Sequence, residues 1–196
     1  MRTAVAIAHD LLRRGIAPGD AVIDATAGNG HDTLFLAQLT GPGGIVFAFD
    51  VQPAALAATR RRLNEAGLPR ESCQLIPAGH ETMRAAIPSA LHGRIAAVVF
   101  NLGYLPGGDK SLTTTAATTI PAIQTALDLL RPGGLLVAVL YTGHPGGAEE
   151  AAAVRTFAES LPSVWSVREQ CQDNTLRPAP SVLSLQKPPA AAPDSA

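Results

Sequence analysis

The segment 21–32 constrains the fold of this chain more than any other stretch of its sequence. A short apolar run ends at Asp24, small residues occupy most of 25–30, and a helical pattern begins at His31. Residues with little or no side chain let a backbone approach a ligand closely at the N-terminus of a helix. The segment therefore predicts a strand, a tight turn and a helix, which together begin a nucleoside-binding α/β sheet.

The acidic residues around this turn predict which nucleoside cofactor binds there. Asp50 follows the next apolar run, at a position where an acid accepts hydrogen bonds from both ribose hydroxyls. A dinucleotide-binding turn needs a third glycine, and Thr33 stands in its place. S-adenosylmethionine (SAM) has no phosphate but carries an ammonium group, for which Asp24 and Asp32 are candidate partners. We predict SAM and keep a dinucleotide as the weaker alternative; a role of Asp32 limited to the helix dipole explains one acid only.

Apolar runs and helical patterns alternate along the chain, which is typical of an α/β fold with helices on both faces of a mostly parallel sheet. We expect strands at 21–24, 45–49, 74–76, 95–100, 135–141, 164–168 and 181–185, the last two forming an antiparallel edge. We expect helices at 3–14, 31–39, 53–66, 81–86, 120–130 and 148–160, and a turn at 131–134. These elements predict one doubly wound, seven-stranded domain over 1–187 and a disordered Pro/Ala-rich tail over 188–196.

The composition limits the classes of partner. Apolar residues make up 46% of the 196 residues and charged residues 16%, as in an ordinary globular domain. The net charge of −1 argues against a broad nucleic-acid-binding surface but leaves a local RNA pocket open. Cys73 and Cys171 lie far apart without metal-ligand spacing, so we expect reduced thiols and no metal. We find neither a signal peptide nor a long apolar segment, and we predict a cytoplasmic protein without a membrane span.

Candidate ligand-binding residues lie at the ends of five of the expected strands or follow them. Ligands of parallel sheets bind beyond the carboxyl ends of the strands. The segments at these ends are 24–30, 50, 78–80, 101–104 and 141–144. We therefore expect them to meet in one crevice.

The loop that starts at Asn101 predicts the methyl acceptor. Its opening over 101–104 resembles the Asn/Asp-Pro-Pro-Tyr loop of amino-group methyltransferases. In such a loop the Asn oxygen and a backbone carbonyl accept hydrogen bonds from the target amine, and the aromatic ring stacks on a flipped-out base. The alternative is a glycine-rich turn with Tyr104 packed in the core. Because neither cysteine is expected in the crevice, transfer to nitrogen is simpler than transfer to a pyrimidine carbon.

Three histidines are candidates for supporting roles. An aliphatic amine has a pKa of about 10.4, so its neutral form must be favoured or its proton removed. His144 and His31 are candidates for this task, although hydrogen bonding or positioning is the more ordinary role. His80 is placed to flank an adenine ring or to serve as a structural loop residue. We interpret the arginines at 60–62 as a solvated helix face and the threonines within 113–119 as a helix cap.

Longer motifs resemble a family of bacterial proteins described as rRNA methylases. The resemblance rests on residues 24–33, 47–50, 100–111 and 143–145, and it covers about residues 1–187. The family includes a SAM-dependent enzyme that methylates 5-aminomethyl-2-thiouridine at the wobble position of tRNA. The resemblance implies a Rossmann-like class I methyltransferase fold, a tRNA anticodon stem-loop as partner and a homodimer.

The resemblance also implies roles for individual residues, and it adds Asn29 and Gln52 to the SAM site. The predicted cofactor-binding residues are Asp24, Ala27, Gly28, Asn29, Gly30, Asp32, Asp50, Gln52, His80 and Asn101. The residues implied to hold the modified uridine are Leu102, Gly103, Tyr104, Leu105, Pro106 and Gly107. The predicted catalytic residues are Asn101, Tyr104 and His144. Thr142 and the segment 113–117 depart from the family pattern on the acceptor side.

Three other functions remain as alternatives. A methyltransferase of this fold can act on an rRNA base or a small-molecule amine instead of tRNA. A methyltransferase-like RNA-binding module without activity is a second alternative, but it has no need of both Asp50 and Asn101. A dehydrogenase is the third, and Thr33 disfavours it.

Overall fold

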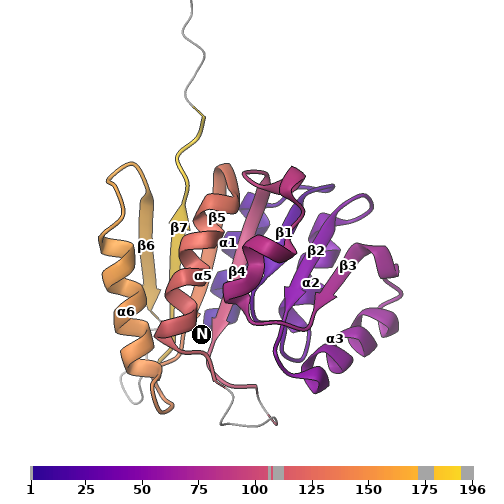
Figure 1. The fold of residues 1–196 in the computed structure, drawn as a ribbon, viewed down its shortest axis with the longest axis horizontal. Helices are drawn as coiled ribbons and strands as arrows, with labels where there is room; N and C mark the ends of the chain where they lie inside the picture. Colours follow the sequence, from indigo (N-terminus) through magenta and orange to yellow (C-terminus); the bar gives the residue numbers. More distant parts are fainter. Residues whose placement is uncertain (1, 106, 108–112, 172–178, 191–196) are drawn as a thin grey trace, which may run out of the picture.

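The apolar runs of the sequence form one seven-stranded sheet in the computed structural model, which describes residues 2–105, 107, 113–171 and 179–190. The strands lie in the order β3-β2-β1-β4-β5-β7-β6 (Figure 1). Neighbouring strands are parallel from β3 to β5, and β7 pairs antiparallel with both β5 and β6. The predicted mostly parallel sheet with an antiparallel edge is therefore confirmed. Its strands are β1 (Ala21–Asp24), β2 (Ile45–Phe49), β3 (Cys73–Ile76), β4 (Ile95–Leu102), β5 (Leu130–Leu140), β6 (Ser166–Cys171) and β7 (Ser181–Gln186).

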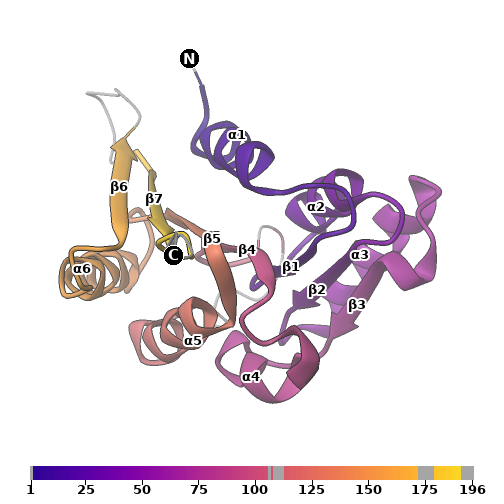
Figure 2. The same cartoon turned by 90° about the horizontal axis from the view of Figure 1, so that it is seen from above.

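Helices cover both faces of this sheet, as the alternating pattern predicts. Figure 2 shows α1, α2 and α3 on one face and α4, α5 and α6 on the other. The helices are α1 (Ala4–Gly15), α2 (His31–Thr40), α3 (Pro53–Glu65), α4 (Met83–Ala86), α5 (Ala116–Leu129) and α6 (Gly147–Glu159). Thr3 caps α1 by accepting a hydrogen bond from Ala6 N (3.1 Å), and Pro53 begins α3, a position where its missing N–H is not needed.

Two apolar cores, one on each face, hold the sheet between the helices. Val98 and Phe100 of β4 point into the core beneath α4, α5 and α6, whereas Ala97 and Val99 point into the core beneath α1, α2 and α3. All four of these side chains are buried. This burial on both faces explains why β4 reads as a continuous apolar run rather than as an alternating pattern.

The structure corrects the predicted turn at 131–134, because these residues belong to β5. Ile95 pairs with Leu130 and Ala97 pairs with Leu135. An advance of five residues along β5 therefore lies beside an advance of two residues along β4. A bulge accommodates the extra residues, and Gly133 adopts a φ of 74° within it. The Pro-Gly-Gly signal therefore marks a bulge inside a strand rather than the end of a helix–strand connection.

Other boundaries differ in ways that matter for the site. β4 extends past the predicted 95–100 to include Asn101, so this side chain is held by a strand and not by a loop. α5 begins at Ala116, four residues before the predicted start, and carries Pro121 inside it. β6 lies at 166–171 rather than 164–168, with Cys171 as its last residue. Lys187, at the predicted domain boundary, donates hydrogen bonds to the carbonyls of Leu127 and Leu130 (3.0 and 2.8 Å).

Across the described part of the chain, none of the helices combines the length and the apolar character that a membrane crossing requires.

Candidate active site

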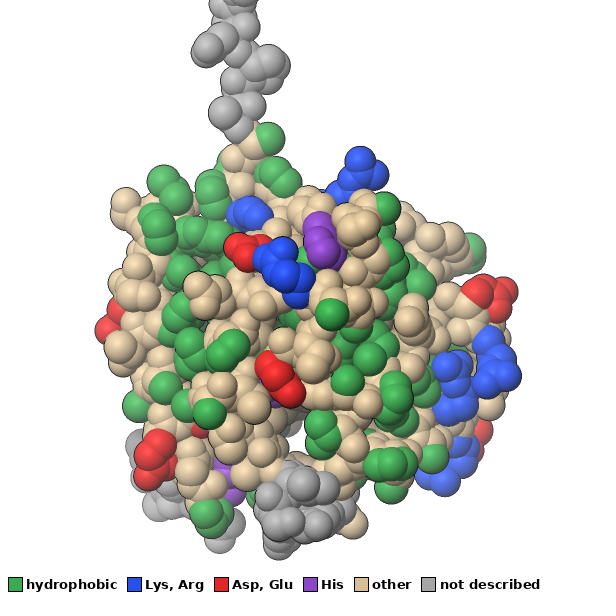
Figure 3. Space-filling view, viewed as in Figure 1, with side chains coloured by type: hydrophobic (Ala, Val, Ile, Leu, Met, Phe, Trp, Pro, Cys, Tyr) green, Lys and Arg blue, Asp and Glu red, His purple; other side chains and the backbone are tan. Residues whose placement is uncertain are grey.

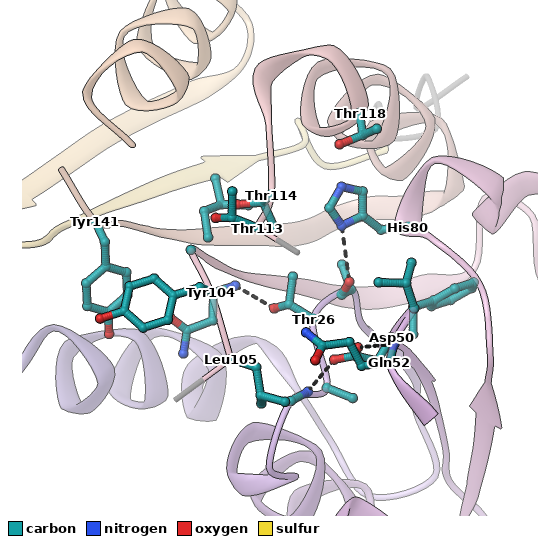
Figure 4. A pocket seen from close by; sticks show the side chains of 18 of the residues that line it. Thr26, Asp50, Gln52, His80, Tyr104, Leu105, Thr113, Thr114, Thr118 and Tyr141 are labelled. Atoms are coloured by element: carbon teal, nitrogen blue, oxygen red, sulfur yellow. Dashed lines mark hydrogen bonds between the residues drawn. The ribbon is translucent and has the colours of Figure 1, made fainter. Parts of the chain in front are cut away.

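A cavity of about 640 Å³ opens at the edge where the parallel strands end. This volume falls within the range of about 300–1,000 Å³ that is usual for small-molecule sites. The lining comes from the segments 25–29, 31–32, 49–52, 78–81, 101–105, 113–115 and 141–144, and from Thr118 and Pro180. All five strand-end segments predicted to converge contribute to it. Figure 4 shows Tyr104 and Tyr141 at one end of the cavity and Asp50, Gln52 and His80 at the other.

Hydrogen bonds and a glycine hold the turn between β1 and α2 against the rest of the sheet. Ala25 N and Ala27 N donate to backbone carbonyls of β4 and β2, over 2.9 and 2.8 Å. Gly30 precedes α2 with a φ of 78°, and a Cβ atom there would lie 2.7 Å from Cα of Thr59 in α3. Both backbone conformation and packing therefore require glycine at 30. Gly30 lies outside the cavity lining, whereas Ala27, Gly28 and Asn29 belong to it.

Asp24 is fully buried beneath the turn and does not line the cavity. Its Oδ2 accepts a hydrogen bond from Thr33 Oγ1 (2.6 Å), and its Oδ1 accepts one from Thr26 N (3.1 Å). Burial, reinforced by the charge of Asp32, raises the pKa of Asp24 to about 7. The geometry thus corrects the prediction that Asp24 contacts a cofactor, because its oxygens serve the protein's own donors. Asp32 is the acid of this turn that lines the cavity.

Asp50 directly follows β2, and two backbone donors hold its carboxylate. Gly28 N donates to Oδ2 over 2.9 Å and Gln52 N donates to Oδ1 over 2.8 Å, as the dashed lines of Figure 4 mark. Each oxygen keeps a second lone pair, so the carboxylate can still accept two hydroxyl hydrogen bonds from the cavity. Val51, next to it, lines the cavity and is 56% exposed, which is unusual for a valine. The pair presents an acceptor and an apolar surface side by side.

His80 is buried at the same end of the cavity. Its Nδ1 lies 3.3 Å from Ala25 O, and because a carbonyl only accepts, Nδ1 carries the hydrogen. Burial lowers the pKa of His80, which favours the neutral ring. Its edge packs against Phe100 at a centroid distance of 5.5 Å. Nε2 is buried and, among the described residues, has no hydrogen-bond partner, so it is left as an acceptor.

Asn101 lines the cavity, and Asp32 orients its amide. Asn101 N donates to Thr26 Oγ1 (2.7 Å), and Asn101 Nδ2 donates to Asp32 Oδ2 (3.1 Å). A carboxylate only accepts, so the amide nitrogen must face Asp32. This leaves Asn101 Oδ1 as an acceptor for another group. The other carboxylate oxygen of Asp32 lies 2.7 Å from Nε2 of His9, a residue of α1.

The loop after β4 brings Tyr104 to the cavity. Tyr104 pairs with Thr113 across the loop, lines the cavity and is 40% exposed. Tyr104 is therefore not packed in the core, which was the alternative to a substrate-stacking role. Leu102, Gly103 and Leu105 also line the cavity, whereas Gly107 does not. Pro106, predicted to contact the substrate, lies outside the described residues.

The two histidines considered as proton acceptors differ in their surroundings. His144 lines the cavity and packs edge-on against Tyr104, with ring centroids 5.8 Å apart. His144 Nδ1 lies 3.0 Å from Pro145 O, and in the described part of the chain its Nε2 has no hydrogen-bond partner. His31 also lines the cavity, but its Nε2 accepts a hydrogen bond from Arg62 (3.1 Å). Of the two, His144 has an Nε2 without a hydrogen-bond partner among the described residues, and this nitrogen is buried.

The arginines of α3 were predicted to form a solvated face, and the structure corrects this for two of them. Figure 3 shows positive side chains gathered over α3. Arg62 donates to Asn29 O over 2.8 Å as well as to His31, and Arg60 donates to Cys73 O over 3.3 Å. Arg61 pairs with Glu65 on the surface, as a solvated face predicts. Arg62 thus supports the turn that lines the cavity.

The predicted capping of a helix by the threonines within 113–119 is wrong, because two of these side chains bond to a buried carboxylate instead. Thr115 precedes α5 without a capping hydrogen bond from its side chain. Thr114 and Thr119 instead donate to the two carboxylate oxygens of Glu150, over 2.7 and 2.6 Å. Glu150 is buried in α6, so the sequence could not reveal this contact between distant segments. The only sign of this contact in the sequence was the run of threonines, whose hydroxyl groups can donate to a buried carboxylate as well as cap a helix.

Several cavity residues had no individual role in the sequence interpretation, although Tyr141 lies in the predicted segment 141–144. Tyr141 follows β5 and lines the cavity, and its burial, reinforced by the charge of Asp32, raises the pKa of its phenol. Other lining residues lie outside the five predicted segments and were not predicted to bind a ligand. They are Phe49, Val51, Glu81, Thr113, Thr114, Thr115, Thr118 and Pro180. Thr113 Oγ1 is buried and has no hydrogen-bond partner within the described ranges. The segment that leads into α5 therefore contributes part of the cavity wall.

The lining fits a nucleoside cofactor with an amino-acid part. Asp50 offers two acceptors for ribose hydroxyls, and Val51 with His80 offers surfaces for a base. Asp32 offers a carboxylate for an ammonium group at the N-terminus of α2. Nε2 of His80 is a buried acceptor without a donor among the described residues, and a cofactor could supply one. Among the described residues, no group of three or more acidic, His or Cys side chains is placed to hold a metal.

Comparisons with known proteins agree with this chemistry. A family model described as "Putative rRNA methylase" matches residues 46–186. The curated protein "tRNA (mnm(5)s(2)U34)-methyltransferase, chloroplastic" of Arabidopsis thaliana is 42% identical over 172 residues, which is 84% of this chain. The match spans 62% of that relative's length.

Two solved structures match nearly the whole chain. One is a "putative rRNA-methylase" from Clostridium thermocellum, with 37% identity, a TM-score of 0.89, and coverage of 95% of this chain and 98% of that one. The other is a "putative methyltransferase" from Streptococcus mutans in complex with S-adenosylhomocysteine (SAH), with 34% identity and a TM-score of 0.84. It covers 95% of this chain and 99% of its own. The chain thus belongs to the family described as rRNA methylases, and it is a SAM-dependent methyltransferase with a Rossmann-like class I fold.

Proposed function

We propose that this methyltransferase transfers the methyl group of SAM to the exocyclic amine of 5-aminomethyl-2-thiouridine at the tRNA wobble position. The observation that carries the proposal is Asn101, whose amide is turned by Asp32 so that its oxygen is left as an acceptor at the cavity. An acceptor oxygen at this place suits a nitrogen that bears hydrogens. The name of the Arabidopsis thaliana relative, which specifies a modified uridine at tRNA position 34, supports the same acceptor.

The cofactor end of the cavity is assigned to the residues around β1, β2 and β3. Asp50 binds the ribose hydroxyls, Val51 and His80 contact the base, and Gln52 lies beside them. The turn residues Ala27, Gly28 and Asn29 approach the amino-acid part, and Asp32 accepts from its ammonium group. Bound SAM supplies a methyl group activated by its positively charged sulfur. The protein's task is to hold that group in line with the acceptor nitrogen.

The acceptor end is assigned to the loop after β4 and the end of β5. Asn101 Oδ1 accepts one N–H of the amine, which directs the nitrogen lone pair toward the methyl group. Tyr104 provides an exposed ring on which a flipped-out base can stack. Leu102 and Leu105 give this end an apolar surface, which disfavours the charged form of the amine. These contacts favour a neutral, oriented nucleophile.

The amine must also lose a proton, because a new N–C bond replaces an N–H bond. His144 Nε2 is the candidate group to hold that proton, since it lies beside Tyr104 without a partner among the described residues. The tRNA anticodon stem-loop is the partner that presents the wobble base. We assign its contact surface to the cavity mouth at Tyr104 and His144.

An rRNA base is the second candidate acceptor, because the matching family model is described as an rRNA methylase. The two acceptors can be distinguished with purified protein, SAM and RNA from a strain that lacks the gene. We expect mass spectrometry of the digested tRNA to show 5-aminomethyl-2-thiouridine converted to its N-methyl form, with rRNA unchanged. Methylation of rRNA alone, or no methylation of either RNA, would reject tRNA as the acceptor. Heat-denatured protein is the control for non-enzymatic methylation.

A further inference from the structure

Side chains from three elements form a hydrogen-bonded row that ends at the predicted amine acceptor. His9 Nε2 of α1 lies 2.7 Å from Asp32 Oδ1 of α2, and Asp32 Oδ2 accepts from Asn101 Nδ2 of β4 over 3.1 Å. The carboxylate only accepts, so His9 Nε2 carries the hydrogen in the first of these bonds. Asp32 and Asn101 line the cavity, whereas His9 does not. Asp32 is therefore the cavity residue through which His9 can act on the site.

The ring of His9 is itself held in one orientation. It stacks on Phe35 of α2 with a centroid distance of 3.7 Å and an interplanar angle of 2°. The Arg13 guanidinium lies 4.9 Å from the centre of the same Phe35 ring. His9 and Asp32 keep only 19% and 10% of their side chains exposed. A flat, packed ring with one donor aimed at the carboxylate restricts the rotation of that carboxylate.

Asp32 has more than one possible arrangement without this support. A carboxylate has about four lone-pair directions, and a partial rotation about its Cα–Cβ or Cβ–Cγ bond moves the oxygen that faces Asn101 away from the amide. If Asp32 turns, Asn101 Nδ2 loses its partner and the amide is free to turn as well. The amine would then face an N–H donor instead of an acceptor. Misplacement of a reacting group by about 1 Å is enough to slow a reaction about a hundredfold.

We propose that His9 is a positioning residue of the methyl transfer, which holds Asp32 so that the oxygen of Asn101 faces the acceptor. This proposal rests on the proposed function for its kinetic consequence, but the row itself does not depend on which acceptor is used. A merely structural His9 would only attach α1 to α2 through the Phe35 stack. The two roles predict different results for matched variants of α1.

The first readout is the side-chain amide of Asn101 in ¹⁵N-labelled protein bound to SAH, identified by its absence in Asn101→Ala. We expect His9→Ala to shift or broaden this signal, because Asp32 is no longer held. His9→Gln keeps an N–H donor and should retain the wild-type signal. Thr3→Ala removes the cap of α1 without touching Asp32, and it should lower the melting temperature while leaving the signal in place.

The second readout is methyl transfer to tRNA at saturating SAM. We expect His9→Ala to lower kcat by about tenfold to a hundredfold with a much smaller change in SAH affinity, and His9→Gln to recover most of it. An unchanged Asn101 signal in His9→Ala, or an equal loss of kcat in Thr3→Ala, would overturn the positioning role. If the wild-type protein leaves tRNA unmethylated, the proposed function fails, and the Asn101 signal still decides whether His9 holds the row.

Discussion

Two acids of one turn differ in what surrounds them, and this difference separates a structural residue from a site residue. Asp24 is closed off by Thr26 and Thr33, while Asp32 has an oxygen at the cavity and bonds to His9 and Asn101. Burial raises the pKa of the Asp24 carboxyl, although the hydrogen bonds from Thr26 and Thr33 oppose the rise. Asp24 therefore contributes to the stability of the turn, whereas Asp32 orients the side-chain amide of Asn101 at the cavity.

Asp24→Asn tests the raised pKa of Asp24 through the pH dependence of stability. In the unfolded chain this group titrates near 3.8, and in the folded protein its pKa is about 7. The folded state thus binds the proton more tightly, so the stabilisation is complete below the unfolded pKa and is lost as pH rises through the folded one. Relative to Asp24→Asn, the wild-type free energy of unfolding should fall between pH 4 and 7 and level off above 8. Urea denaturation across this range measures it, and parallel curves for the two proteins would contradict it.

Asn101→Ala tests the residue at the end of the row. Removing the amide takes away the acceptor for the amine, so we expect tRNA methylation to fall by about two orders of magnitude. SAH binding should be largely kept, because Asp50 and the turn 27–29 remain in place. Single-turnover kinetics and calorimetry measure the two quantities. Gln170→Ala, on the exposed strand β6, is the control. Full activity of Asn101→Ala would reject the role of Asn101.

At the scale of elements, α6 reaches the active site through a buried carboxylate. Glu150 accepts hydrogen bonds from Thr114 and Thr119, and Thr114 N donates to Gly103 O over 3.1 Å. The same loop pairs Tyr104 with Thr113. Residues 113–114, which lead from the loop after β4 into α5, are therefore held by α6 as well as by residues 103–104.

Glu150→Ala should weaken both the fold and the acceptor loop. Thr114 and Thr119 would each lose the acceptor for a hydroxyl, and a buried unsatisfied group costs about 1–3 kcal/mol. We expect a lower free energy of unfolding in urea, and a larger loss in tRNA methylation than in SAH binding. The neighbouring Glu149→Ala removes an exposed carboxylate of the same helix and should change neither. Equal effects of the two substitutions would contradict the anchoring of the loop by Glu150.

Element boundaries were predictable where local chemistry sets them. The bounds of β1 and β2 agree with the sequence prediction, because apolar runs stop at Asp24 and before Asp50. The start of β5 was not predictable, since Pro132, Gly133 and Gly134 carry the composition of a turn and become a bulge only through pairing with β4. The early start of α5 follows from packing of its threonines against α6.

At the scale of the whole molecule, topology accounts for how much of the site the sequence revealed. Parallel strands place their carboxyl ends on one edge, so motifs that follow strands converge whatever their spacing. This argument located the turn at 25–29, Asp50, His80 and Asn101 around one cavity. Contacts between distant surfaces leave no local pattern, and His9, Glu150 and the buried Asp24 required the structure.

Because the cavity joins β1, β2 and β4, a cofactor that binds there should stabilise the whole fold. At a ligand concentration of 100 times Kd, binding adds about 2.7 kcal/mol, which corresponds to a rise in Tm of roughly 5–10 °C for a chain of this size. We expect SAH to produce a shift of this order in the wild-type protein and a much smaller one in Asp50→Asn. The amide places an N–H group opposite a backbone donor and removes an acceptor for the ribose.

Asp128→Asn is the matched control for that measurement, because Asp128 pairs with Arg84 on the surface and does not line the cavity. The control should keep the wild-type shift at the same SAH concentration in differential scanning fluorimetry. A full shift in Asp50→Asn would mean that the ribose contact lies elsewhere along the edge. A small shift in both variants would instead indicate a general loss of charge rather than loss of the Asp50 acceptor. Only a loss specific to Asp50 assigns the end of β2 to the cofactor, because the two substitutions remove the same charge from different places.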